Sequence, residues 1–189
     1  DCCSALLLSC QGGHGRVPSL LPRRAAELDL QNSDGYTALM TAAGCDQERV
    51  VELLLPRGAQ CSLQSSDGGT ALMGAAINGH ERVVELLLQR GAEFNLQSSN
   101  GGTALMLAAL FNHPAVVRRL LRAGADAAAR APTGETALQM AKEKGHAECV
   151  RVIEEFTAAA QAEVAAAREA ERAAAEAEAT RHAEALLAE

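Results

Sequence analysis

A seven-residue segment recurs in this chain at a constant interval of 33 residues. It appears as DGYTALM at 34–40, DGGTALM at 67–73, NGGTALM at 100–106 and TGETALQ at 133–139. A second motif keeps the same interval, as VVELLL at 50–55 and again at 83–88. A fixed period of this length predicts a solenoid of stacked units, because one unit alone cannot bury its apolar face.

Extending the period to both sides predicts five units and a separate C-terminal arm. The first unit is degenerate, since Pro18 and Pro22 stand where the later units carry helix-forming residues. Proline inside a helix removes a backbone hydrogen bond, so we expect a shortened second helix there. The predicted repeat domain is 1–156, with units 1–33, 34–66, 67–99, 100–132 and 133–156, and the arm is 157–189.

The motifs within each unit resemble those of the ankyrin-repeat family. The period carries T-x-L near the start, then A-A, a G-H step seen at 79–80 and 145–146, V-V-x-L-L-L at 50–55 and 83–88, and G-A. Ala38 and Met40 depart from the Pro and His of the family pattern. The resemblance covers 1–156 and implies an all-α repeat solenoid of five stacked 33-residue helix-turn-helix units with short β-hairpin loops. A long C-terminal helix would follow.

Local signals fit two short helices in each unit. Thr37 is placed to cap a first helix, and Leu39, Ala42 and Ala43 then fall on one face of it. The step Gly79-His80 ends the first helix of its unit, and Gly91 supplies a left-handed stop for the second. Asp67-Gly68 is a pair typical of hairpin turns.

The resemblance also implies where a partner would bind, because this family uses the tips of its turns and its first helices. Ile77, Leu110 and Phe111 are apolar at positions where solvated residues are expected, which is typical of a binding hot spot. Alternatively, Leu110 and Phe111 fill a groove between repeats. The predicted partner-binding residues are Tyr36, Asp67, Ile77, Asn78, Leu110, Phe111, Glu135 and Lys144.

The C-terminal arm is predicted to be one long helix. From Ala147 to Glu189 there is neither Gly nor Pro, and Ala, Glu and Arg dominate. One role for residues 157–189 is a spacer or a self-associating coiled coil. The other is a fraying, solvated helix, which we favour because isolated helices without packing are marginal; Val164, Leu186 and Leu187 do not make the sustained heptad of a coiled coil.

Composition and spacing do not favour catalysis, a metal site or nucleic-acid binding. The chain has 17 Lys and Arg against 24 Asp and Glu, and 2% aromatic residues, so it lacks the basic patch and stacking rings that nucleic acids need. His14, His80, His113 and His146 share one repeat position, which predicts a structural role. The six cysteines form no C-x-x-C pair, which favours a reducing, cytoplasmic location.

No glycine-rich segment has the spacing of a phosphate-binding loop, so no cofactor is predicted. No apolar run approaches the roughly 20 residues of a membrane span. The sequence therefore predicts a non-catalytic protein-binding module or scaffold that binds through its concave face. The alternative is that these repeats are the targeting or regulatory region of a larger enzyme, channel or ligase adaptor.

Overall fold

The computed structural model describes residues 28–187, with side chains for residues 28–176. The chain divides into two compact units, Asp1–Ile153 and Glu154–Glu189, which are described separately below. The predicted first repeat, 1–33, lies almost wholly outside the described residues, as does the shortened helix expected around Pro18 and Pro22.

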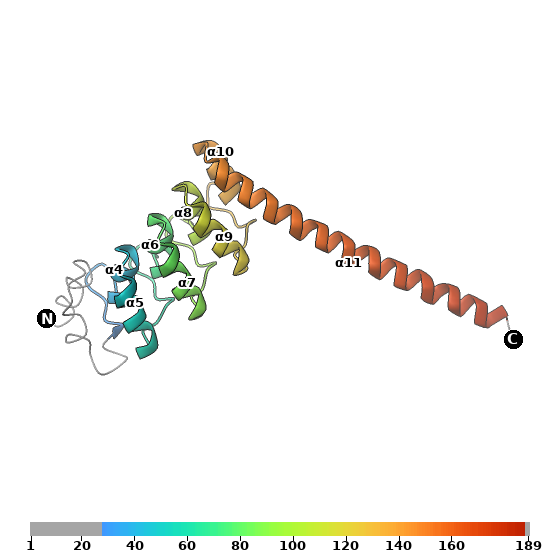
Figure 1. Ribbon diagram of the computed structural model, residues 1–189, viewed down its shortest axis with the longest axis horizontal. Helices are drawn as coiled ribbons and strands as arrows, with labels where there is room; N and C mark the ends of the chain where they lie inside the picture. Colours follow the sequence, from blue (N-terminus) through green and yellow to red (C-terminus); the bar gives the residue numbers. More distant parts are fainter. Residues whose placement is uncertain (1–27, 188–189) are drawn as a thin grey trace. The chain divides into compact units, whose positions relative to one another are not determined.

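Four helix pairs follow one another in the first compact unit (Figure 1). The first helices of the pairs pack against each other in one row, and the second helices form a row beside them. This arrangement confirms the predicted all-α repeat solenoid. The pairs are α4 (Ala38–Gly44) with α5 (Glu48–Leu54) and the 3-10 turn η1 (Leu55–Arg57), α6 (Ala71–Asn78) with α7 (Glu81–Gln89), α8 (Ala104–Leu110) with α9 (Pro114–Arg122), and α10 (Ala137–Lys144) with the start of α11 (Ala147–Leu187).

A threonine begins every first helix, as the sequence predicts. The hydroxyl oxygen of Thr37 accepts a hydrogen bond from the Met40 N–H at 3.2 Å, and Thr70, Thr103 and Thr136 repeat this contact. Each bond satisfies a backbone donor that has no partner inside the helix. Gln139 adds a reciprocal bond to the Thr136 N–H, which completes a capping box in the last unit.

Small and aliphatic side chains build the core between the helices. The alanine pairs of the first helices, such as Ala75 and Ala76, are fully buried, which lets neighbouring helices approach closely. Val83, Val84 and Leu87 of α7 are also fully buried. This core contains no aromatic side chain among its fully described buried residues, so many thin apolar layers, rather than one thick centre, exclude water.

The last unit has a more polar surface than the units before it. Leu138 is only partly buried, whereas its equivalent Leu105 is 1% exposed. Gln139 and Lys142 are exposed at positions that Met106 and Ala109 fill with buried apolar groups one unit earlier. Polar residues therefore stand where a further unit would stack, as is usual for the terminal unit of a solenoid.

Hairpin turns connect the units, and their backbone bonds match the predicted Asp-Gly signal. The Ser65 N–H donates to the Gly69 carbonyl, and the Gly68 N–H donates to the Ser65 carbonyl. Gly68 has φ +74, so it occupies the left-handed position of a three-residue hairpin loop. The paired stretch is too short to form a β-strand, and residues 28–187 contain none.

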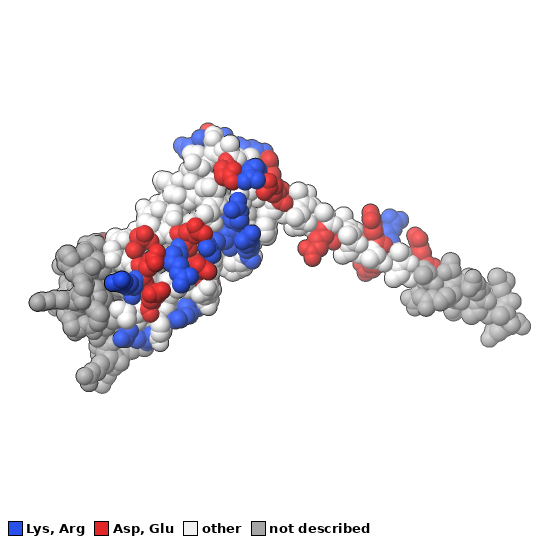
Figure 2. Space-filling model, in the orientation of Figure 1, with Lys and Arg blue, Asp and Glu red and all other residues white. Residues whose placement is uncertain are grey.

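Opposite charges alternate along the second helices (Figure 2). Arg119 of α9 contacts Glu81 at 2.8 Å and Glu85 at 3.4 Å on α7, and Arg82 of α7 lies 3.9 Å from Glu52 on α5. Exposed pairs of this kind contribute about 0–1 kcal/mol each. They place the charged surface of the repeat stack on the second helices.

The second compact unit consists of the continuation of α11. All side chains from residue 158 to residue 176 are exposed, including Val164, which is 52% exposed. The helix predicted from Ala147 is thus present and ends at Leu187. No helix within residues 28–187 is both long enough and apolar enough to cross a bilayer.

Candidate functional site

A groove of about 610 Å³ crosses the hairpin tips and the first helices of three units. Its walls come from α4, α6 and α8 and from the turns that precede them. One side of α4 and of α6 lines the groove from the first turn of the helix to its last residue, while the alanine pairs of the same helices are buried in the core. The lining residues are Asn32, Asp34, Tyr36, Met40, Thr41, Gly44, Cys45, Asp67, Gly69, Thr70, Met73, Gly74, Ile77, Asn78, Ser98, Asn100 and Leu107.

The floor of the groove is apolar. Met40 and Met73 are 5% and 3% exposed and form its base, and Ile77 and Leu107 are half-buried. Gly44 leaves open space on the groove wall, because a Cβ atom added there would meet nothing within 4 Å, whereas one added at Gly74 would lie 3.6 Å from the Gly44 Cα atom of α4. Polar residues make up much of the remaining lining, so the groove combines apolar contact surface with groups that can orient a ligand.

Two carboxylates stand at the edge of the groove, on consecutive hairpin tips. Asp34 and Asp67 are both exposed. Asp67 accepts hydrogen bonds from the Ser65 hydroxyl and from the Gly69 N–H, and the Ser65 bond is the main reason that the pKa of the Asp67 carboxyl is lowered from 3.8. Hydrogen bonds to a carboxylate favour its charged form. The edge of the groove is therefore negatively charged at neutral pH.

A ladder of glutamine side chains fixes the spacing of the tips. Gln31 donates to the Gly35 carbonyl of its own turn at 2.8 Å and to the Gln64 carbonyl of the next unit at 2.9 Å. Gln64 repeats both contacts one unit later, with Gly68 and Gln97 as the acceptors. The backbone adds a bond from the Ser66 N–H to the Asp34 carbonyl. The backbones of the two tips that carry Asp34 and Asp67 are thus held together.

A histidine ladder joins the first helices, which confirms the structural role predicted for the three described members of the set. Nε2 of His80, His113 and His146 lies 2.8–3.0 Å from a carbonyl of the preceding first helix, at Gly44, Ile77 and Leu110 in turn. Asn78 reinforces the first of these contacts, because its amide donates to the carbonyls of Gly44 and Gly74.

The groove brings together four of the eight predicted binding residues. Tyr36, Asp67, Ile77 and Asn78 line it, and the Tyr36 side chain is 39% exposed. The sequence analysis did not single out Met40 or Leu107. A signal for Leu107 was present, because its repeat position holds Thr41, Gly74 and Met140 in the other units, while the next position is Ala in all four units from residue 34 onward.

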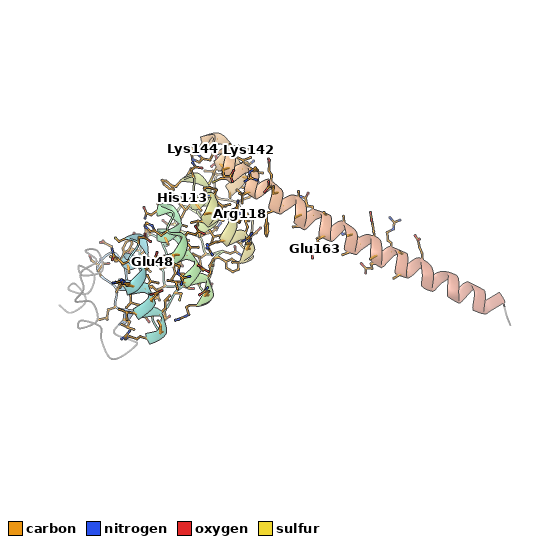
Figure 3. The ribbon with its side chains drawn as sticks, in the orientation of Figure 1. Glu48, His113, Arg118, Lys142, Lys144 and Glu163 are labelled. Carbon is orange, nitrogen blue, oxygen red and sulfur yellow. The ribbon has the colours of Figure 1, made fainter. Side chains whose placement is uncertain are left out.

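The other four predicted residues lie outside the groove lining. Phe111 is 50% exposed at the end of α8, and Leu110 is half-buried. Glu135 is engaged within its own turn, where its carboxylate accepts from the Thr133 hydroxyl at 2.9 Å. Lys144 lies on α10, beside Lys142, at the end of the row of first helices (Figure 3).

The described cysteines show no arrangement for nucleophilic or metal chemistry. Cys149 is fully buried, and burial raises the pKa of its thiol; burial also raises the pKa of the Cys61 thiol. Cys45 is exposed on the groove wall as a free thiol. Within the part of the chain that the structure describes, no three His, Cys, Asp or Glu residues are grouped so that they could hold a metal ion.

Comparison with known proteins agrees with the repeat, the helix pairs and the turns. The family model described as ankyrin repeats (3 copies) matches residues 1–65, 51–131, 72–168 and 105–188. No curated protein matches the sequence. Ankyrin repeats generally mediate protein–protein interaction and are typically non-catalytic. With matches that extend over residues 1–188, this chain belongs to the ankyrin-repeat family.

Proposed function

We propose that the repeat domain is a non-catalytic module that binds a segment of a protein partner in the groove between the hairpin tips and the first helices. The observation that carries this proposal is the apolar floor, where Ile77 and Leu107 are only half-buried and Gly44 leaves the space beside α4 open. Apolar side chains of a partner would remove this surface from water, at about 25 cal/mol for each Å² buried.

The rigidity of the groove supports the same function. Hydrogen bonds from Gln31, Gln64 and the backbone of Ser66 connect neighbouring tips. The ring of His80, at the start of α7, contacts the Gly44 carbonyl of α4 in the preceding unit. A site that is already ordered loses little conformational entropy when a partner binds. The charged second helices, by contrast, already use many of their charges in ion pairs with one another (Figure 2).

Filling the groove at Gly44 tests the proposal. Gly44→Leu places an isobutyl group in open space at the end of α4, while Gly44→Ala changes the same backbone position and adds a single methyl group. Both residues favour the helix over glycine, so neither change should unfold it. Affinity capture from a source-cell lysate should retain a partner on wild type and on Gly44→Ala, but not on Gly44→Leu.

Equal retention on both Gly44 variants, with unchanged circular dichroism, would show that the partner binds elsewhere. A second comparison then locates the surface. Ile77→Lys changes the groove floor, whereas Phe111→Lys changes a half-exposed ring outside it. Loss of the partner through Phe111→Lys alone would move the binding surface towards α8 and α10.

A further inference from the structure

We infer that the partner segment held in this groove carries an arginine next to apolar side chains. The inference rests on the proposed function and names the chemistry of the partner. Its basis is the combination of two carboxylates and one aromatic ring in the groove lining, where consecutive hairpin tips contribute Asp34, Tyr36 and Asp67 beside the apolar floor.

The charge of the groove has one sign. Asp34 and Asp67 are its carboxylates, and no Lys or Arg belongs to its lining. Basic residues of the described stack lie outside this lining; for example, Arg82 and Arg119 are on the second helices in ion pairs, and Lys142 and Lys144 are on α10 (Figure 3). A cationic ligand in the groove would therefore be attracted by two carboxylates. An anionic ligand would find no positively charged side chain in the lining.

The two carboxylates keep capacity for a ligand. Only one carboxylate oxygen of Asp67, Oδ1, accepts hydrogen bonds within its own turn, and these bonds also lower the pKa of the carboxyl. The side chain of Asp34 forms no hydrogen bond or ion pair with the described residues, and its backbone carbonyl holds the next tip through Ser66. A guanidinium has five donors in a planar fork, so it can serve two carboxylates at once.

Tyr36 favours arginine over lysine. Its ring is 39% exposed and lines the groove two residues after Asp34. A guanidinium stacks on an aromatic face while it donates to carboxylates at its edge, whereas an ammonium is a compact and strongly hydrated charge. The neighbouring floor of Met40, Met73 and Ile77 then takes the apolar side chains that accompany the arginine.

A random-peptide display library, selected on the full chain, provides the probe. The enriched peptide is synthesised with a fluorescent label, and its affinity is measured by anisotropy. We expect arginine beside large apolar residues in the enriched sequences. The Asp34→Asn/Asp67→Asn double variant should weaken binding by about tenfold, because each exposed carboxylate–guanidinium pair contributes roughly two- to fivefold. Asparagine keeps an acceptor oxygen for the bonds that Asp67 receives from Ser65 and Gly69.

A matched control removes the same number of charges away from the groove. Asp126 also accepts a backbone N–H within its own loop, from Ala128 at 2.8 Å, and Glu48 is exposed on α5 (Figure 3). The Glu48→Gln/Asp126→Asn double variant should change the affinity by less than about twofold. In the peptide, Arg→Lys should weaken binding to wild type more than binding to a Tyr36→Leu variant.

The outcomes separate this inference from the proposed function. In one outcome, peptides bind wild type, fail to bind Gly44→Leu, and bind the Asp34→Asn/Asp67→Asn variant with unchanged affinity. That result would refute the inference of an arginine but would leave the groove as the binding site. Peptides that bind Gly44→Leu as well as wild type, or a selection that enriches no peptide, would overturn both. Circular dichroism of each variant confirms that the repeat fold is intact.

Discussion

The contact between neighbouring hairpin tips predicts a large difference between two glycines at the same repeat position. Gly35 and Gly134 have φ values of +80° and +87°, so alanine is strained at both. An alanine in the left-handed conformation destabilises the folded state by about 1–2 kcal/mol. Replacing glycine also lowers the conformational entropy of the unfolded chain, which offsets about 0.4–1 kcal/mol of this cost. Gly134→Ala, with nothing within 4 Å of its added Cβ, should therefore cost roughly 0.5–1.5 kcal/mol.

Gly35→Ala should cost more because the next tip is in the way. Its added Cβ would lie 2.6 Å from Ser66 N, where ordinary contacts begin at 3.4 Å, so the two tips must separate by about 0.8 Å. That movement breaks the 2.9 Å bond from the Ser66 N–H to the Asp34 carbonyl, at a further cost of about 0.5–1.5 kcal/mol. The expected difference between the two variants is thus about 1 kcal/mol.

Urea denaturation followed by circular dichroism measures this difference. The comparison requires that both variants keep the wild-type m-value, since repeat arrays can lose two-state behaviour. Equal free energies of unfolding for Gly35→Ala and Gly134→Ala would refute the reasoning, because the tip contact would then contribute nothing to stability.

Three further predictions concern the stack and the arm. Leu105→Ala should cost about 2–5 kcal/mol in urea denaturation and Leu138→Ala clearly less, because Leu105 is 1% exposed and Leu138 is only partly buried; equal costs would contradict this. His113→Leu should lower the thermal midpoint more than His113→Gln, since leucine leaves the Ile77 carbonyl without its donor; the reverse order would exclude that bond as the cause. Ala166→Pro should reduce helical circular dichroism but leave the unfolding midpoint of the repeats unchanged, because residues 158–176 are exposed, and a shifted midpoint would mean that the arm supports the repeats.

The repeat period was enough to predict most of the local structure. Thr37 and its equivalents cap the first helices, Gly79 and Gly91 adopt left-handed conformations at helix ends, and His113 joins two units. These features depend on residues within one unit or on a contact that repeats with the period. A single alignment of the units therefore contains the information that specifies them.

The groove could be predicted only in part, because it depends on how side chains from three units converge. The period shows that Ile77 and Leu110 are equivalent, yet Ile77 lines the groove and Leu110 does not. The difference comes from their surroundings: Gly44 leaves open space in the groove that Ile77 lines. Such space is a property of neighbouring layers, and a comparison of equivalent positions does not contain it.

The hydrogen bonds of the tips also limit how a partner can be recognised. The carbonyl of Asp34 and the N–H of Ser66 bond to each other, Asp67 and Ser99 do the same one unit later, and Gln64 occupies the Gly68 carbonyl. The row of tips therefore does not act as an open sheet edge that could accept an additional strand from a partner. Recognition is left to the side chains that the tips present, such as Asp34, whose side chain takes no part in the bonds that hold the tips together.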